Sequence, residues 1–422
     1  MTADSDAVNA ALADAHRREW GLVLGATVRV ARDLELAEEC VQEAYTAALA
    51  SWPRDGVPTN PGAWLTSIAR RRAVDAIRRE RAWRARLPLL VEPDAMDDLP
   101  LEPMTTDAEV IPDERLRLIF LCCHPALAQD AQLALTLRLV CGLPTADIAS
   151  ALLVSESTMA ARITRAKKKI SSARIPFRMP DAAELPERLQ AVLAVIHLLF
   201  TTGHTAPSGD SLMRPDLVDR ALHLARTLRS LMPDEPEVAG LLALMLVIDA
   251  RRTTRVDAAG RLLRLEEQDR SQWDRPAIAE AHDLIAENVR RGRAGRYLLQ
   301  AAIASLYAEA PTYAETDWPQ IVAMYDALLA VWPSPVVALN RIVAVSMVAG
   351  PGAALAELRD LEGDDRLVRY RYLPAIRADL LRRLGRHEEA AKDYRHALEL
   401  TDNEAERVFL SERLADQIRS PE

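Results

Sequence analysis

One segment divides this chain and restricts what it can fold into. Residues 91–114 hold nine acidic residues and no basic one, and residues 88–112 contain five prolines. Such a stretch repels itself, lacks several of the backbone donors that a helix needs and has little apolar surface to bury. We therefore expect residues 89–112 to form an acidic, flexible linker between parts that fold separately.

The parts on either side of this linker are predicted to be helical, so the expected fold class is all-α. The 422 residues include only 15 glycines, and apolar residues recur at helical spacing along most of the chain. A chain of this length exceeds what one hydrophobic core usually supports. We expect small helical domains at residues 7–88 and 113–178, and a larger helical domain at residues 181–420.

Basic residues gather on both sides of the linker, although the whole chain has a net charge of −9. Residues 60–86 hold eight arginines against two acidic residues, and residues 155–178 hold seven basic residues against one. Cationic helices of this kind suit the phosphate backbone of nucleic acids, because each neutralised phosphate releases counterions. For the arginine segment taken alone, a solvated surface is an equally good interpretation.

Three helices are predicted before the linker. Two of them cover residues 7–52 and meet at a break near Arg32, and one side of the second carries Leu36, Cys40, Val41, Ala44 and Leu49. The next segment, PRDGVPTNPG, is predicted to be a loop by its proline, glycine and asparagine content. A long third helix should run from Ala63 to about Leu87 with its arginines outward.

The sharpest local signal is LPTADIASALLVSESTMAARITRAKKKI at residues 143–170, which predicts a helix-turn-helix. Ser155 or Ser157 would cap the second helix by accepting backbone N–H bonds. That helix would bury Met159, Ile163 and Ala166. Its early polar residues would meet base edges in the major groove, and its terminal lysines would hold phosphates. An ordinary helical hairpin with a solvated basic face is the alternative for this segment alone.

Residues beyond 183 show only helical patterns, and two segments there suggest an internal repeat. Aligning Gly350 with Gly385 gives a spacing of 35 residues, close to the roughly 34-residue tetratricopeptide period. Around Gly385, the residues Ala390, Tyr394 and Ala397 match that repeat's pattern of small and aromatic residues. We therefore expect residues 181–420 to form a tetratricopeptide-like domain that contacts other proteins.

Other candidate sites are given structural interpretations. Cys122, Cys123 and His124 are adjacent but have no partner pair at zinc spacing, so we expect buried thiols and no metal site. His197 and His204 are interpreted as packed or capping side chains, with a ligand or switch role as the alternative. Several aromatic residues are expected to pack between helices more readily than to line a peptide groove; they are Trp318, Tyr325, Trp332, Tyr370, Tyr372 and Tyr394.

Several function classes find no support in the sequence. No P-loop, GxGxxG, HExxH or GxSxG motif is present, so we expect no catalytic residue, no cofactor and no enzymatic activity. No apolar run approaches the roughly 18 residues of a membrane span, and the N-terminus lacks a signal-peptide core. We expect a cytoplasmic protein with no membrane partner, which the absence of a disulfide-like cysteine pattern also fits.

Taken in order, these segments resemble the extracytoplasmic-function (ECF) sigma factors of bacterial RNA polymerase. DLELAEECVQEAYTAAL resembles the second-region helix that grips the β′ coiled coil of core polymerase. NPGAWLTSIARRRAVDAIRR resembles the stretch that melts and reads the −10 element. The segment from LRLIFLCCHPAL to TRAKKKI resembles the fourth region, which reads the −35 element and contacts the β flap. Together these segments cover most of residues 10–178.

The resemblance implies a role for particular residues. It assigns core-polymerase binding to Glu38, Glu39, Gln42 and Glu43. It places along the −10 DNA the residues Asn60, Trp64, Arg70, Arg71, Arg78 and Arg79. It places at the −35 element the residues Ser155, Glu156, Thr158, Arg162, Arg165, Lys167, Lys168 and Lys169. Arg71 stands where many members have an asparagine, and Ala160 and Ala161 replace residues that are often polar, so no promoter sequence is implied.

The C-terminal segment narrows the resemblance to a subgroup with a long tetratricopeptide-like extension, on stretches such as DRSQWDRPAIAE and PSPVVALNR. In that subgroup no dedicated anti-sigma factor is expected, and the extension contributes to control, which implies a protein partner. The alternative is a stand-alone helix-turn-helix regulator of transcription whose helical domain senses a ligand or a protein. That alternative leaves residues 38–43 without a role.

Overall fold

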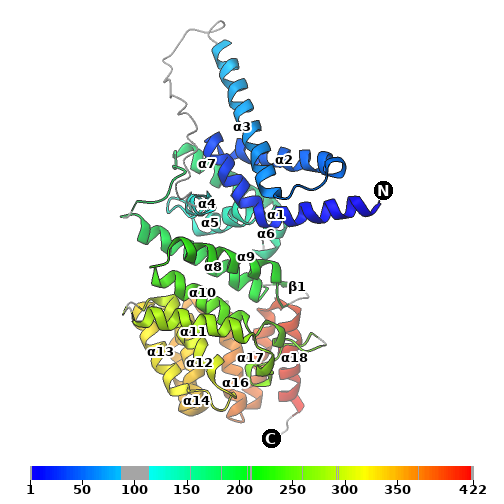
Figure 1. Cartoon of the computed structure of the whole chain (residues 1–422). Coiled ribbons are helices and arrows are strands. Elements are labelled where there is room, and N and C mark those ends of the chain that lie inside the picture. The colour runs from blue at the N-terminus through cyan, green and yellow to red at the C-terminus, as the bar shows by residue number, and fades with distance from the viewer. Residues whose placement is uncertain are drawn as a thin grey trace. The chain divides into compact units, whose positions relative to one another are not determined.

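The computed structural model describes residues 2–86 and 114–419, except residues 153, 182, 207, 210, 211, 259, 291, 293 and 369. The predicted acidic linker at 89–112 therefore lies outside the described residues. The chain divides into two compact units, Met1–Val195 and Ile196–Glu422. Within the described ranges nearly every element is a helix (Figure 1), which confirms the all-α fold class.

The first unit contains two helical modules and the beginning of α8. The N-terminal module consists of α1 (Thr2–Ala31), α2 (Leu34–Asp55) and α3 (Pro61–Arg86). The helix-turn-helix module consists of α4 (Glu114–Cys122), α5 (Gln129–Leu135), the π-helical segment η2 (Thr136–Val140), α6 (Thr145–Ala151) and α7 (Glu156–Ser172), and α8 spans Leu185–His204.

Local chemistry sets the ends of the first three helices. Arg32 adopts the left-handed conformation with φ of 53°, and the Asp33 carboxylate accepts a 2.8 Å hydrogen bond from the backbone of Leu36 at the beginning of α2. The loop before α3 is shorter than predicted, because α2 continues to Asp55 and α3 begins at Pro61. Proline suits a first helical turn, where its missing N–H has no partner to lose.

The hydrophobic core of the N-terminal module is built from one side of each of its three helices. Leu24, Val41, Trp52 and Leu65 are almost completely buried. The expectation that Leu49 joins this core is wrong, because 54% of its surface is exposed. Burial along α2 follows positions 41, 44, 48 and 52, and the residue after Ala48 is rotated about 100° away from that side.

The helix-turn-helix pair is formed by α6 and α7, as predicted. Ser155 caps α7, and its Oγ accepts a 3.2 Å hydrogen bond from the backbone of Thr158. The buried side of α7 consists of Met159, Ile163 and Ala166, as expected, and also Ile170. In the described part of the chain, most polar and basic residues of α7 thus face outward.

The described residues of the second unit form the end of α8 and ten further helices in successive antiparallel pairs (Figure 1). They are α9 (Pro215–Leu231), α10 (Pro236–Asp249), α11 (Arg275–Arg290), α12 (Arg296–Glu309), α13 (Trp318–Val331), α14 (Pro335–Val348), α15 (Gly350–Leu358), α16 (Tyr372–Arg383), α17 (His387–Glu399) and α18 (Glu404–Arg419). Short 3₁₀ turns lie at Arg252–Thr254, Leu265–Glu267, Arg270–Gln272, Arg359–Leu361 and Asp365–Leu367, and β1 (Ser208–Gly209) pairs in parallel with β2 (Asp402–Asn403).

The two glycines aligned in the proposed repeat occupy equivalent corners. Gly350 is the first residue of α15 at its turn from α14 and has φ of 86°, and Gly385 lies between α16 and α17 with φ of 73°. Only glycine adopts this left-handed region without strain. The tetratricopeptide assignment itself remains a prediction, but each glycine permits a tight turn between two helices.

The histidines and cysteines singled out in the sequence are packed inside the fold. His197 meets Tyr297 edge-on, and His204 stacks on Phe200. Burial lowers the pKa of His197 to about 4 and that of His204 to about 2, so both imidazoles are neutral. All four cysteines are buried thiols outside any disulfide, as expected for structural cysteines.

The aromatic residues expected to pack between helices do not form one groove. Trp318 and Tyr394 belong to two separate buried clusters. Tyr325 and Trp332 pack against the first of these clusters and Tyr370 against the second. This arrangement favours the inter-helix interpretation over a peptide groove for these residues.

Candidate nucleic-acid interface

Of the six candidate residues at the arginine helix α3, four are exposed, and one of these is Asn60, which directly precedes the helix. Arg71, Arg78 and Arg79 are exposed, and the second half of α3 extends beyond α1 and α2 (Figure 1). The other candidates are tied to the fold. Asn60 accepts a 2.9 Å hydrogen bond from the backbone of Ala63 and so caps the helix.

The two remaining α3 candidates are partly buried. Trp64 packs edge-on against Trp52, with ring centroids 5.6 Å apart. Arg70 has a buried Nε without a hydrogen-bond partner among the described residues. These side chains can set the position of α3 more readily than they can reach a ligand.

Trp83 was missed by the sequence analysis. It lies near the end of α3 between Arg81 and Arg84, and 64% of its surface is exposed. An exposed indole on a helix that also carries exposed arginines is suited to stack on an unpaired base. The available signal was an aromatic residue in a helical segment that is otherwise basic.

The helix α7 presents most of its candidates to solvent. Ser155, Glu156, Thr158, Arg165, Lys168 and Lys169 are exposed. Arg162 instead lies 3.4 Å from the carboxylate of Asp130 on α5. Lys167 is directed toward the N-terminal module, where it pairs with Glu38.

The acidic candidates on α2 fall into two groups. Glu39, Gln42 and Glu43 are exposed, and Glu43 pairs with Arg72 of α3 at 2.6 Å. Glu38 differs from the expectation of an outward-facing residue, since only 5% of its surface is exposed. It occupies the side of α2 that meets the helix-turn-helix module, where Arg138 lies 2.9 Å from its carboxylate.

Two glycines allow the modules of the first unit to approach closely. A Cβ at Gly21 would lie 2.5 Å from the carbonyl oxygen of Val140, and a Cβ at Gly25 would lie 2.7 Å from that of Glu114. An ion pair between Arg29 and Glu114, at 3.1 Å, flanks this contact. The small residues on α1 thus admit the backbone of α4 and η2.

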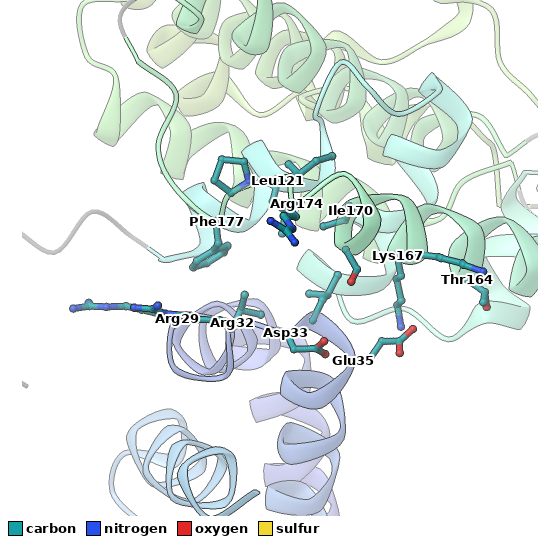
Figure 2. Close-up of a pocket in the computed structure, with 16 residues that line it drawn as sticks. Arg29, Arg32, Asp33, Glu35, Leu121, Thr164, Lys167, Ile170, Arg174 and Phe177 are labelled. Atoms are coloured by element: carbon teal, nitrogen blue, oxygen red, sulfur yellow. The ribbon is translucent and has the colours of Figure 1, made fainter. Parts of the chain in front are cut away.

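A cleft of about 740 Å³ lies between the α1–α2 corner and the end of α7. Figure 2 shows Arg29, Arg32, Asp33 and Glu35 on one side of it, and Lys167 reaching from α7 on the other. The cleft therefore lies between the beginning of α2 and the end of α7, beside the Lys167–Glu38 ion pair that joins these two helices.

These two modules define a class of protein, the sigma-type initiation factors that carry one helical module for each promoter element. The sigma-70 region 2 family matches residues 16–83, and the sigma-70 region 4 family matches residues 117–170. A family of unknown function (DUF6596) matches residues 188–289.

Curated relatives place the chain more narrowly. The ECF RNA polymerase sigma factor SigK of Mycobacterium tuberculosis (strain ATCC 25618 / H37Rv) is 30% identical over 165 residues, which are 38% of this chain and 84% of that protein. SigK of Mycobacterium ulcerans (strain Agy99) is 31% identical over 147 residues, 33% of this chain and 73% of that protein. An uncharacterized protein of Rhizobium meliloti (strain 1021) is 44% identical over 392 residues, 93% of this chain and 92% of that protein. The chain belongs to the ECF RNA polymerase sigma factors.

Family membership settles the class of activity. Sigma factors are transcription initiation factors and not enzymes, so the expected non-enzymatic, DNA-binding role is confirmed. Across residues 2–86 and 114–419 we find neither a helix with the length and hydropathy of a membrane span nor a cluster of side chains suited to a metal ion.

Proposed function

We propose that this sigma factor binds core RNA polymerase in the cytoplasm and directs initiation at promoters whose −10 and −35 elements it reads with α3 and α7. One observation carries this proposal. Each of the two modules anchors one helix by its apolar side and leaves several basic residues of that helix exposed, among them Arg78 and Arg79 on α3 and Arg165 and Lys168 on α7. The proposed polymerase contacts are the β′ coiled coil and the β flap.

The polymerase contact is proposed for the outer side of α2. Glu39, Gln42 and Glu43 are exposed and lie three or four positions apart, so they share one helix face. Carboxylates in this arrangement suit a basic partner helix. Glu38 is proposed as a further contact, which requires that it first leave Arg138 and Lys167.

The promoter contacts are proposed for exposed cations and capping residues. On α3, Arg71, Arg78 and Arg79 would neutralise phosphates of the −10 DNA, with Asn60, Trp64 and Arg70 holding the helix in position. On α7, the first-turn residues Ser155, Glu156 and Thr158 would lie at base edges of the −35 element, followed by Arg162, Arg165, Lys167, Lys168 and Lys169 along its backbone.

The C-terminal region is proposed to modulate this activity by contact with a protein, with domains bounded at 7–88, 113–178 and 181–420. The support is its series of antiparallel helix pairs, with Gly350 and Gly385 at matching corners. Helix repeats of this kind build extended surfaces for partners. Comparing transcription by the full chain with transcription by residues 1–195 tests the proposal, and equal activity would contradict it.

The main experiment is run-off transcription with the full chain, purified core polymerase and genomic fragments. We expect promoter-dependent transcripts. A chain that neither binds core polymerase nor yields a transcript would refute the proposal.

A charge reversal separates this role from that of a stand-alone regulator. Glu39→Lys combined with Glu43→Lys is expected to abolish polymerase binding and leave the α3 and α7 surfaces intact. Asp55→Lys is a matched control, since this exposed residue lies at the other end of α2. Equal polymerase binding by both variants would remove Glu39 and Glu43 from the polymerase contact, whereas unchanged DNA binding with no polymerase binding by the original chain would point to the stand-alone regulator.

A further inference from the structure

We propose that a pocket in the second unit binds a small organic anion, with a carboxylate attached to an aromatic or aliphatic body. The pocket has a volume of about 280 Å³ and is bounded by α10, α12, α13 and α14. Trp273, Tyr307, Tyr313 and Trp318 line it, and Arg251 is the charged residue of its wall. This volume is close to the lower end of known ligand sites, so it suits a small molecule.

Arg251 is the first reason to expect an anion. It lies two residues after the end of α10, and among the described residues the groups that act on its charge are Tyr307 and Arg270, with no carboxylate among them. The adjacent Arg252 is fully engaged, with Asp249 at 2.7 Å and Asp219 at 2.8 Å. Burial lowers the pKa of Arg251, and nearby Arg270 lowers it further. A guanidinium nevertheless stays charged, so a positive charge is held at this wall.

Arg270 adds a second uncompensated cation beside the pocket. Only 8% of its surface is exposed. Its Nη1 donates to the carbonyl oxygens of Tyr307 and Ala310, at 2.6 and 2.7 Å. Its Nη2 is buried without a hydrogen-bond partner among the residues described, and its guanidinium lies over the ring of Trp273 at 4.7 Å. The wall of the pocket is therefore backed by positive charge.

The carboxylates that act on the pocket residue Tyr313 are already paired with other arginines. Glu266 and Asp379 both act on Tyr313, but Glu266 lies 2.5 Å from Arg264 and Asp379 lies 2.7 Å from Arg382. Burial raises the pKa of Tyr307, so its phenol stays neutral and supplies no negative charge. A bound anion would supply the negative charge that Arg251 and Arg270 lack.

The residues that line the pocket determine which chemical group is attached to the acidic group of the ligand. A carboxylate can accept two parallel hydrogen bonds from one guanidinium. The four aromatic side chains then offer ring faces and edges to an apolar body. An inorganic anion would leave this apolar surface uncovered. Arg251 and the aromatic residues together thus require a ligand with one acidic group on a compact apolar body.

Calorimetric titration of the full chain tests the proposal with three probes of known structure. Phenylpropionate should bind with a Kd on the order of 1 mM or tighter. Phenylpropionamide has the same shape without the charge, and inorganic phosphate has the charge without the body. Both should bind at least roughly tenfold more weakly. Equal binding of acid and amide, binding of phosphate as tight as that of the acid, or no saturation by the acid would overturn the proposal.

Two variants locate the binding. Arg251→Gln should weaken phenylpropionate binding roughly tenfold or more. Ala304→Leu enlarges a side chain that lines the pocket from α12, keeps Arg251 in the sequence and should remove binding as well. Arg290→Gln is the matched control, since Arg290 is exposed on α11. Retained binding in Ala304→Leu would place the ligand elsewhere, and this outcome is informative even if Arg251→Gln fails to fold.

Discussion

The carboxylate of Glu38 accepts a 2.9 Å hydrogen bond from Arg138, which joins α2 of the N-terminal module to η2 of the helix-turn-helix module. The second oxygen of the same carboxylate pairs with Lys167 of α7. Glu38, which is proposed to bind polymerase, and Lys167, which is proposed to bind the −35 element, are therefore paired with each other. Under the proposed function, both can reach their partners only after the two modules separate.

The first prediction concerns the glycines that permit this closed contact. Gly25→Ala would place a Cβ 2.7 Å from a backbone oxygen of α4, which cannot move away as a flexible side chain could. Alanine favours a helix over glycine, so any loosening would come from the clash. We expect faster hydrogen exchange across α4. We also expect several-fold tighter binding to core polymerase, because the competent fraction rises.

The control for this prediction is Gly352→Ala, where an added Cβ meets nothing within 4 Å. It should change neither hydrogen exchange in α4 nor polymerase affinity. If Gly25→Ala opens the modules and polymerase binds no more tightly, the closed contact does not limit assembly.

The second prediction compares two glutamates on α2. Glu38→Gln leaves Arg138 and Lys167 partly buried without their shared counter-charge. Breaking a pair of this kind is costly, and we expect a loss of about 1–3 kcal/mol in the free energy of unfolding of the first unit. Glu43→Gln breaks an exposed pair with Arg72 and should cost less than about 1 kcal/mol.

Urea denaturation of the full chain, followed by hydrogen exchange in α2 and α7, measures both values. In a double-mutant cycle, Glu38→Gln should lower the free energy of unfolding by less when the chain already carries Lys167→Met. The two side chains share one interaction, so its loss is counted only once. Strictly additive losses would show that the ion pair contributes nothing to the contact between the modules.

Much of this architecture could be predicted because local signals determine it. Ser155 was expected as a cap and is one, and Met159, Ile163 and Ala166 were expected on the buried side of α7 and lie there. The prediction that Leu49 is buried was wrong because an α-helix does not contain a whole number of residues per turn. A residue one position away from the buried side of α2 therefore faces solvent.

The environment of Glu38 could not be predicted in the same way. Its burial depends on Arg138 and Lys167, which lie 100 and 129 residues further along the chain. Nothing in the local pattern of α2 distinguishes it from the exposed Glu39. The pocket around Arg251 is a similar case, because its aromatic residues come from separate helices and loops that only the fold brings together.

The third prediction concerns the exposed lysines of α7. Lys168→Ala should weaken promoter binding by the holoenzyme about equally for all sequences, and it should reduce the slope of log affinity against log salt by about 0.9 for one lost phosphate contact. Thr158→Ala should instead alter the preference among −35 sequences. Lys392→Ala, an exposed lysine of α17, should leave the slope unchanged. A salt slope unaffected by Lys168→Ala would remove that residue from the DNA contact.

The fourth prediction is an acid-sensitive second unit. Burial lowers the pKa of His197 to about 4 and, together with Arg255 and Arg251, lowers that of His204 to about 2. Unfolded histidines titrate near pH 6.5, so below this pH the unfolded chain binds protons that the folded unit does not. Stability is therefore complete above about pH 6.5 and falls as the pH decreases toward 4, by about 1–2 kcal/mol for each histidine at pH 5.

Denaturation of the second unit at pH 7 and pH 5 measures this loss. His204→Gln keeps a neutral side chain that can donate to the Ile248 carbonyl, the backbone partner of His204, and it should reduce the difference between the two pH values. His197→Gln should reduce it further, since the two imidazoles titrate at separate places. His396→Gln replaces an exposed imidazole on α17 and should preserve the full difference. If the doubly substituted chain loses as much stability at pH 5 as the original, other groups carry the acid response and the buried imidazoles do not.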